Sequence, residues 1–159
     1  MSETARILDQ FRSAYRGPAW HGPALLAVLS DVDARIAAAR PLANAHTIWE
    51  IVLHIAIWMS VATRRMAGEQ IPSLAAYQDW PSAPPPSKSS WRETLDALAK
   101  AEAGLEAAVE KLTDARLNDT LLGDRPWSTY ETLHGAVQHT LYHAGQIALL
   151  KKAARATTA

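Results

Sequence analysis

Two histidines near the C-terminal end of this sequence have the spacing of ligands to one metal ion. His139 and His143 are four residues apart, in the segment HTLYH. On a helix this spacing puts both side chains on one face, about 40° apart around the axis and with Cβ atoms about 6 Å apart. Two imidazoles in this arrangement can each reach one ion at about 2.1 Å. Ala136, Gln146 and Leu150 share the stripe, which indicates that the pair faces the interior.

His54 is the candidate for a third ligand, because it lies in the most apolar stretch of the chain, IVLHIAIWM. Its neighbours one helical turn away include Ile51 and Trp58, so its imidazole is expected to face the core. A buried imidazole needs a partner for at least one ring nitrogen, and a metal ion shared with the C-terminal pair would supply it. Ordinary hydrogen bonds in a polar core cluster are the alternative. His134, five residues before His139, lies off the stripe and is excluded.

Three further residues are candidates for contact with the ligands or with a substrate. Gln146 is one turn past His143 and could hydrogen-bond a metal-bound water or a substrate; equally, it could tie helices together. Trp58 and Tyr142 could line a pocket, although aromatic residues at helical spacing are more often core residues.

The carboxylates of Glu102 and Glu50 are further candidates for a role beside the ligand histidines. Glu102 falls between Leu98 and Leu105 on an apolar stripe, where it could orient a ligand histidine. The reading that we favour puts Ala101 inward and leaves Glu102 at the rim. Glu50 is one turn before the first histidine and could be a general base, but a role in helix capping explains it more simply.

The elements that would position the three histidines are two long helices with clear start signals. The segments TIWE, from Thr47, and STYE, from Ser128, fit capping boxes, in which the first and fourth residues satisfy each other's backbone N–H groups. One helix is expected over about 47–66, with Gly68 as C-cap. The other is expected over about 128–153.

The remaining pattern is also helical, because β-branched residues never alternate with polar ones over a useful length. We expect an all-α four-helix bundle with an interrupted N-terminal helix and a long crossover between helices two and three. The other expected elements are a helix over about 3–15 stopped by Gly17-Pro18, a piece over 22–29, a short turn capped by Ser30 or Asp31 that ends before Pro41, an extended proline-rich connector over 69–87, a helix over about 87–112 and a turn at 123–126.

Composition limits the function classes. The 159 residues suit one domain spanning 1–159. Sixteen basic and sixteen acidic residues give zero formal charge, so the sequence has no basic region that would favour binding of nucleic acid. Cysteine is absent, which excludes thiolate ligands and a cysteine nucleophile. The longest apolar run is too short for a membrane span, and the N-terminal segment does not resemble a signal peptide. We therefore expect a cytoplasmic protein with no membrane partner.

Three segments, HTIWEIVLHIAIW, QHTLYHAGQIALLKK and AWHGP, resemble the DinB-like (DNA-damage-inducible, DinB/YfiT) superfamily. The similarity extends from about residue 4 to residue 152. It implies a four-helix bundle, often a homodimer, with three histidines around one divalent ion such as zinc, nickel or iron. Carried over onto this sequence, the histidines are His54, His139 and His143, and the second and fourth long helices both face the site.

The resemblance also implies a reaction. Some relatives are transferases or isomerases that use a low-molecular-weight thiol, so the leading hypothesis is a metal-dependent thiol S-transferase acting on a small molecule. Three neutral imidazoles leave coordination positions open, as in catalytic sites, and a metal-dependent hydrolase is the alternative. A third hypothesis is a stress-response protein that binds metal without catalysis. Fold resemblance does not choose among these.

Overall fold

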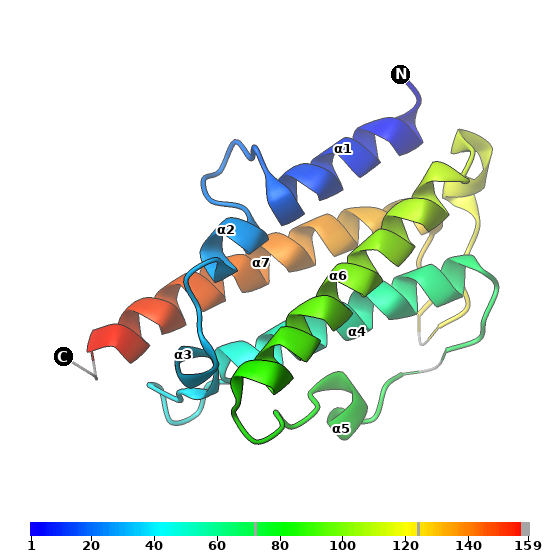
Figure 1. The fold of residues 1–159 in the computed structure, drawn as a ribbon. Helices are drawn as coiled ribbons and strands as arrows, with labels where there is room; N and C mark the ends of the chain where they lie inside the picture. The colour runs from blue at the N-terminus through cyan, green and yellow to red at the C-terminus, as the bar shows by residue number, and fades with distance from the viewer. Residues whose placement is uncertain (72, 124, 157–159) are drawn as a thin grey trace.

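The computed structural model describes residues 1–71, 73–123 and 125–156, and in these ranges it contains helices and no β-strand (Figure 1). This confirms the all-helical prediction. The four long helices are α1 (Glu3–Arg16), α4 (Ile48–Met66), α6 (Lys88–Glu110) and α7 (Thr129–Ala156). The short ones are α2 (Leu25–Leu29), α3 (Ala34–Ala38), α5 (Ala76–Asp79) and the 3-10 helix η1 (Asp114–Asn118).

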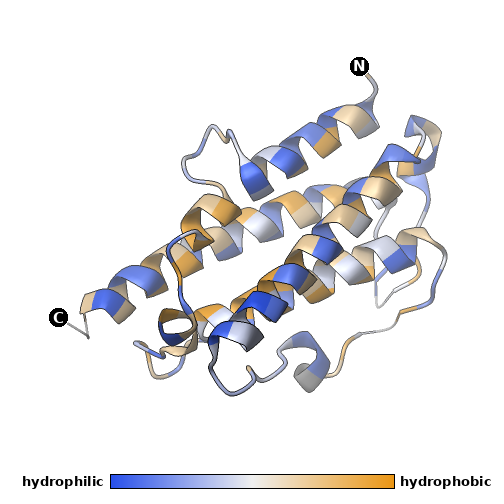
Figure 2. Cartoon of the chain, in the orientation of Figure 1, coloured by the Kyte–Doolittle hydropathy of each residue, from blue (hydrophilic) through white to orange (hydrophobic). Residues whose placement is uncertain are grey.

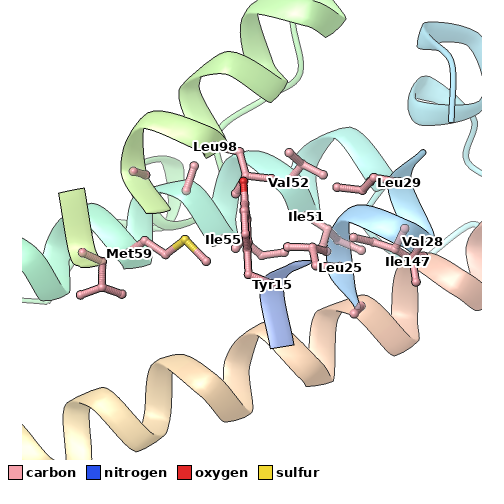
Figure 3. Close-up of a cluster of buried hydrophobic side chains, with 14 of the residues drawn as sticks. Tyr15, Leu25, Val28, Leu29, Ile51, Val52, Ile55, Met59, Leu98 and Ile147 are labelled. Atoms are coloured by element: carbon pink, nitrogen blue, oxygen red, sulfur yellow. The ribbon is translucent and has the colours of Figure 1, made fainter. Parts of the chain in front are cut away.

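The long helices enclose one apolar core. Helix α4 packs against both α6 and α7, and α1 packs against the same two helices from the other side. Hydrophilic and hydrophobic residues alternate along α1 and α6 (Figure 2), as expected for helices that bury one face. Side chains from α1, α2, α4, α6 and α7 meet between the helices (Figure 3), and Ile55, Leu98 and Ile147 are completely buried there.

Both helices that carry the selected histidines begin with the predicted capping boxes. At the start of α4, the Thr47 hydroxyl accepts from the Glu50 N–H at 3.1 Å, and the Glu50 carboxylate accepts from the Thr47 N–H at 2.8 Å. Ser128 and Glu131 make the same reciprocal pair at the start of α7, at 3.1 and 2.8 Å. Glu50 therefore has the capping role, and its carboxylate also binds Arg40.

The N-terminal interruption follows the prediction except at one cap. Helix α1 ends at Arg16, and Gly17 adopts a φ of 81° that favours glycine. The cap predicted at Ser30 or Asp31 is wrong. Asp33 caps α3, accepting from the Ile36 N–H at 2.8 Å, because the Asp31 carboxylate is occupied by basic side chains of α7.

The connector between α4 and α6 contains a helical turn that the proline-rich pattern did not predict. Residues 76–79 form α5, which contacts α4. Helix α5 ends at Asp79, Trp80 follows it, and the segment continues through the prolines to Ser87, which caps α6. None of the helices in the described ranges has the length and apolarity to span a bilayer.

Candidate metal centre

Three imidazoles converge between α4 and α7. His139 Nε2 lies 3.0 Å from His54 Nε2 and 3.0 Å from His143 Nε2. One nitrogen from each ring can be chosen so that all three lie within 4.8 Å of one another. His54 and His143 are buried, and His139 is half-buried. The structure therefore brings together the three histidines that spacing and apolar context select.

The second nitrogen of His54 faces acceptors only. His54 Nδ1 lies 2.8 Å from the backbone carbonyl oxygen of Asp79 and 3.1 Å from its carboxylate Oδ1. A neutral imidazole carries one proton, and neither of these oxygens can donate one when the carboxylate is ionised. Nδ1 therefore holds the proton and donates it, which leaves a lone pair on Nε2, directed at the other two rings.

Gln146 fixes the protonated nitrogen of His143 in the same way. His143 Nδ1 donates to Gln146 Oε1 at 2.6 Å, and Gln146 Nε2 donates to the Tyr142 hydroxyl at 3.1 Å. The second hydrogen bond orients the amide so that its oxygen faces the ring. His143 Nε2 is therefore also left with a lone pair. The Tyr142 side chain itself is mostly exposed, with its ring 5.0 Å from that of His143 between centroids.

The electrostatics of the cluster favour neutral rings. Burial, followed by the nearby imidazoles of His143 and His54, lowers the pKa of His139 to about 3. Burial also lowers the pKa of His143 to about 4, and it lowers the pKa of His54. All three histidines are thus in the unprotonated form that binds metal at neutral pH.

The donor set fits a metal ion. Nitrogens that each lie about 2.1 Å from one ion are separated by about 3.0 to 3.4 Å for bond angles of about 90° to 109°, and the two separations at His139 are 3.0 Å. Without an ion, two lone pairs would meet the same His139 nitrogen, which has at most one proton to share.

Asp79 and Trp80 both contact the His54 ring, and the sequence analysis predicted neither contact. The Asp79 carboxylate accepts from Trp58 Nε1 at 2.7 Å as well as from His54. The Trp80 ring stacks on the His54 ring at 3.8 Å and on His46 at 3.6 Å, each with an interplanar angle of 6°. The signal was weak because both residues lie in the connector, outside any long helical pattern.

Glu102 lies elsewhere, at the contact between α6 and α1. Its carboxylate accepts from Arg16 Nη1 at 2.5 Å, while Asp79 and Gln146 occupy the Nδ1 atoms of His54 and His143. The expectation that Glu102 stays at the rim is wrong, because both Ala101 and Glu102 are buried. Burial and neighbouring Glu106 raise the pKa of Glu102.

The histidine cluster borders a cavity of about 880 Å³, lined largely by α4 and α7. His54, His139, Trp58 and Asp79 are among its lining residues. Of the two aromatic residues considered from the sequence, Trp58 lines the cavity, whereas Tyr142 lies outside its lining; Tyr130 lines the cavity as well. The cavity is of a size typical for small-molecule sites.

Comparison with known proteins identifies one family. The family model described as the DinB superfamily matches residues 19–147. No curated protein and no solved structure matches. The matched range includes all three histidines, Asp79 and Gln146.

Proposed function

The chain belongs to the DinB superfamily, and we propose that it binds one divalent metal ion through His54, His139 and His143. The observation that carries this proposal is the arrangement of the ring nitrogens. The Nε2 atoms converge, while acceptors hold the Nδ1 protons of two of the rings. This is the usual outer arrangement of metal-ligating histidines. The family resemblance implies zinc, nickel or iron.

Two features support a reactive rather than a purely structural site. The protein supplies three ligands, which is typical of catalytic sites, whereas structural zinc sites usually have four. The cluster also borders a cavity large enough for a small molecule. A divalent ion held here would supply Lewis-acid chemistry and lower the pKa of a thiol or water bound to it.

The protein's own side chains have distinct tasks in this proposal. The three histidines bind the ion, and Asp79 and Gln146 fix the tautomers of His54 and His143. Trp80 covers the face of the His54 ring and shields it from water on that side.

We propose a thiol-dependent transferase as the reaction, on the strength of the family resemblance. The second candidate is a hydrolase, which is favoured by the Asp79 carboxylate that lines the cavity beside His54, because hydrolysis needs a nearby base. Non-catalytic metal binding is the third. Conjugation of small thiols to electrophiles, measured beside ester and amide hydrolysis on the metal-loaded protein, separates them. Turnover of neither class in metal-loaded protein would leave the non-catalytic role.

The overall arrangement is part of the same proposal. We infer that α1, α4, α6 and α7 form the four-helix bundle of the family, with a crossover between α4 and α6. We also expect a cytoplasmic location. We expect a homodimer, for which light scattering should give about twice the 17.3 kDa mass of one chain.

Metal content tests the binding site directly. Elemental analysis of the purified protein should find about one divalent ion per chain. His139→Ala and His143→Ala should each lose it, because two remaining imidazoles bind a divalent ion far more weakly than three. His134→Ala is the matched control on the same helix, and it should keep the ion. Full metal retention in both ligand variants would refute the assignment.

A further inference from the structure

We propose that the cavity beside the histidine cluster is a binding site for a small aromatic molecule, with a metal-coordinating group at one end and a hydrogen-bonding group at the other. The proposal rests on the proposed metal site and adds the class of ligand. Its three supports are the aromatic walls of the cavity, an unpartnered nitrogen of a lining histidine and open space along α7.

The walls are unusually rich in rings. Trp58, Trp127, Tyr130 and His134 all line the cavity. Trp127 and Tyr130 are 44% and 42% exposed, so they leave apolar surface uncovered at the same place. Uncovered apolar surface gathered in one cavity indicates a ligand-binding site. Aromatic lining residues favour a flat apolar ligand, since aromatic pairs prefer stacked or edge-to-face contacts.

Trp58 is a rigid wall. Its Nε1 is held by the Asp79 carboxylate at 2.7 Å, and the guanidinium carbon of Arg65 lies 5.9 Å from its ring centroid. Arg65 is itself held, because its Nη2 donates to the Ile71 carbonyl oxygen at 2.8 Å. Because the Trp58 side chain is already ordered, it loses little conformational entropy when a ligand binds.

His134, another lining residue, has a ring nitrogen without a partner among the described residues. Within the described part of the chain, its Nε2 is buried and has no hydrogen-bond partner, although buried polar atoms are nearly always paired. The ring lies 4.3 Å from that of Tyr130 between centroids. His134 precedes His139 by five residues, about 7.5 Å along the helix axis and about 140° around it, and both residues line the cavity.

Space for the ligand comes from a residue without a side chain. A Cβ added at Gly135 would meet nothing within 4 Å, and Gly135 lines the cavity. Gly145 on the same helix also has nothing within 4 Å but lies outside the cavity lining. The two glycines therefore provide a matched pair, in which only Gly135→Leu places a side chain in the cavity.

The test uses Zn²⁺-loaded protein and two hydroxamic acids with the same metal-binding group. We expect benzohydroxamic acid to bind at least about tenfold more tightly than acetohydroxamic acid in calorimetric titrations, because its ring buries additional apolar surface. Gly135→Leu should reduce this ratio to about one and keep the bound Zn²⁺. Gly145→Leu should keep both the ratio and the metal.

A second variant tests the role of His134 Nε2 without filling the cavity. His134→Phe keeps a ring against Tyr130 and removes Nε2. In the wild type, 4-hydroxybenzohydroxamic acid should bind about threefold to tenfold more tightly than benzohydroxamic acid, because its hydroxyl can donate to or accept from His134. This gain should disappear in His134→Phe.

The outcomes separate the two proposals. If the protein holds Zn²⁺ and wild type binds both simple hydroxamates equally, the aromatic site is refuted and the metal site stands. A preference that survives in Gly135→Leu equally refutes this cavity as its source. If the wild type holds no divalent ion, the proposed metal site fails and this inference fails with it.

Discussion

The hydrogen bonds that His54 donates to Asp79 have a measurable effect on metal affinity if Asp79 orients this ligand. Loss of such an outer partner typically weakens metal binding by 10- to 100-fold. In Asp79→Ala only part of the contact is lost, because the backbone carbonyl oxygen of residue 79, 2.8 Å from His54 Nδ1, remains. The carboxylate contacts to His54 at 3.1 Å and to Trp58 at 2.7 Å disappear. We therefore expect the lower limit, about tenfold or about 1.4 kcal/mol.

Competition with a chromophoric chelator measures this change in the Zn²⁺ dissociation constant. Asp79→Asn provides an intermediate step, because its amide oxygen can still accept from both donors, and we expect a loss of about threefold or less. Asp96→Ala, an exposed position on α6, is the control and should match the wild type. Equal affinities for Asp79→Ala and the wild type would show that the main chain alone orients His54, contrary to our reasoning.

Three further predictions concern stability. Chelation should leave the far-ultraviolet circular dichroism largely unchanged, because the apolar core holds the helices; global unfolding would make the ion structural. In metal-free protein, the free energy of urea unfolding should be greatest above about pH 6.5 and fall toward pH 4. The reason is that burial depresses the folded-state pKa of His139 to about 3 and of His143 to about 4, so the unfolded chain binds protons first; a flat profile would contradict this. Arg16→Ala should destabilise the protein by about 1–2 kcal/mol in urea at pH 8, where Glu102, whose pKa is raised to about 7, is mostly ionised and loses its cation; an unchanged midpoint would argue against that pair.

Features set by residues close in sequence were predictable. A capping box involves residues three apart, so Thr47 and Glu50 identify the start of α4 without any tertiary information. The pair His139 and His143 is likewise a property of one helix face. Placing His54 with them needed only its apolar neighbours and the inference that a buried imidazole has a partner.

Features set by packing between distant segments were not predictable in this way. Asp31 and Asp33 are equivalent as caps in the sequence, and the choice between them depends on Lys151 and Arg155, far along the chain, which bind Asp31. The proline-rich connector likewise gave no periodic pattern from which to place one of its acidic residues, Asp79, against His54.

Burial of Glu102 is a further case of this kind. Helical periodicity places Glu102 between Leu98 and Leu105 but does not decide whether Ala101 or Glu102 faces inward, and a buried carboxylate needs a cation nearby. That cation is Arg16 at the end of α1, and only the packing of α1 on α6 reveals it.

The stack of Trp80 between His46 and His54 gives the protein a built-in optical reporter. Indole emission is sensitive to the charge and electron demand of whatever lies against the ring, and here one neighbour is a proposed ligand. Titrating metal into the apoprotein should therefore change the fluorescence without any added dye, and Trp80→Phe should supply the blank. Occupancy of the site could then be followed in real time, at protein concentrations far below those that calorimetry requires.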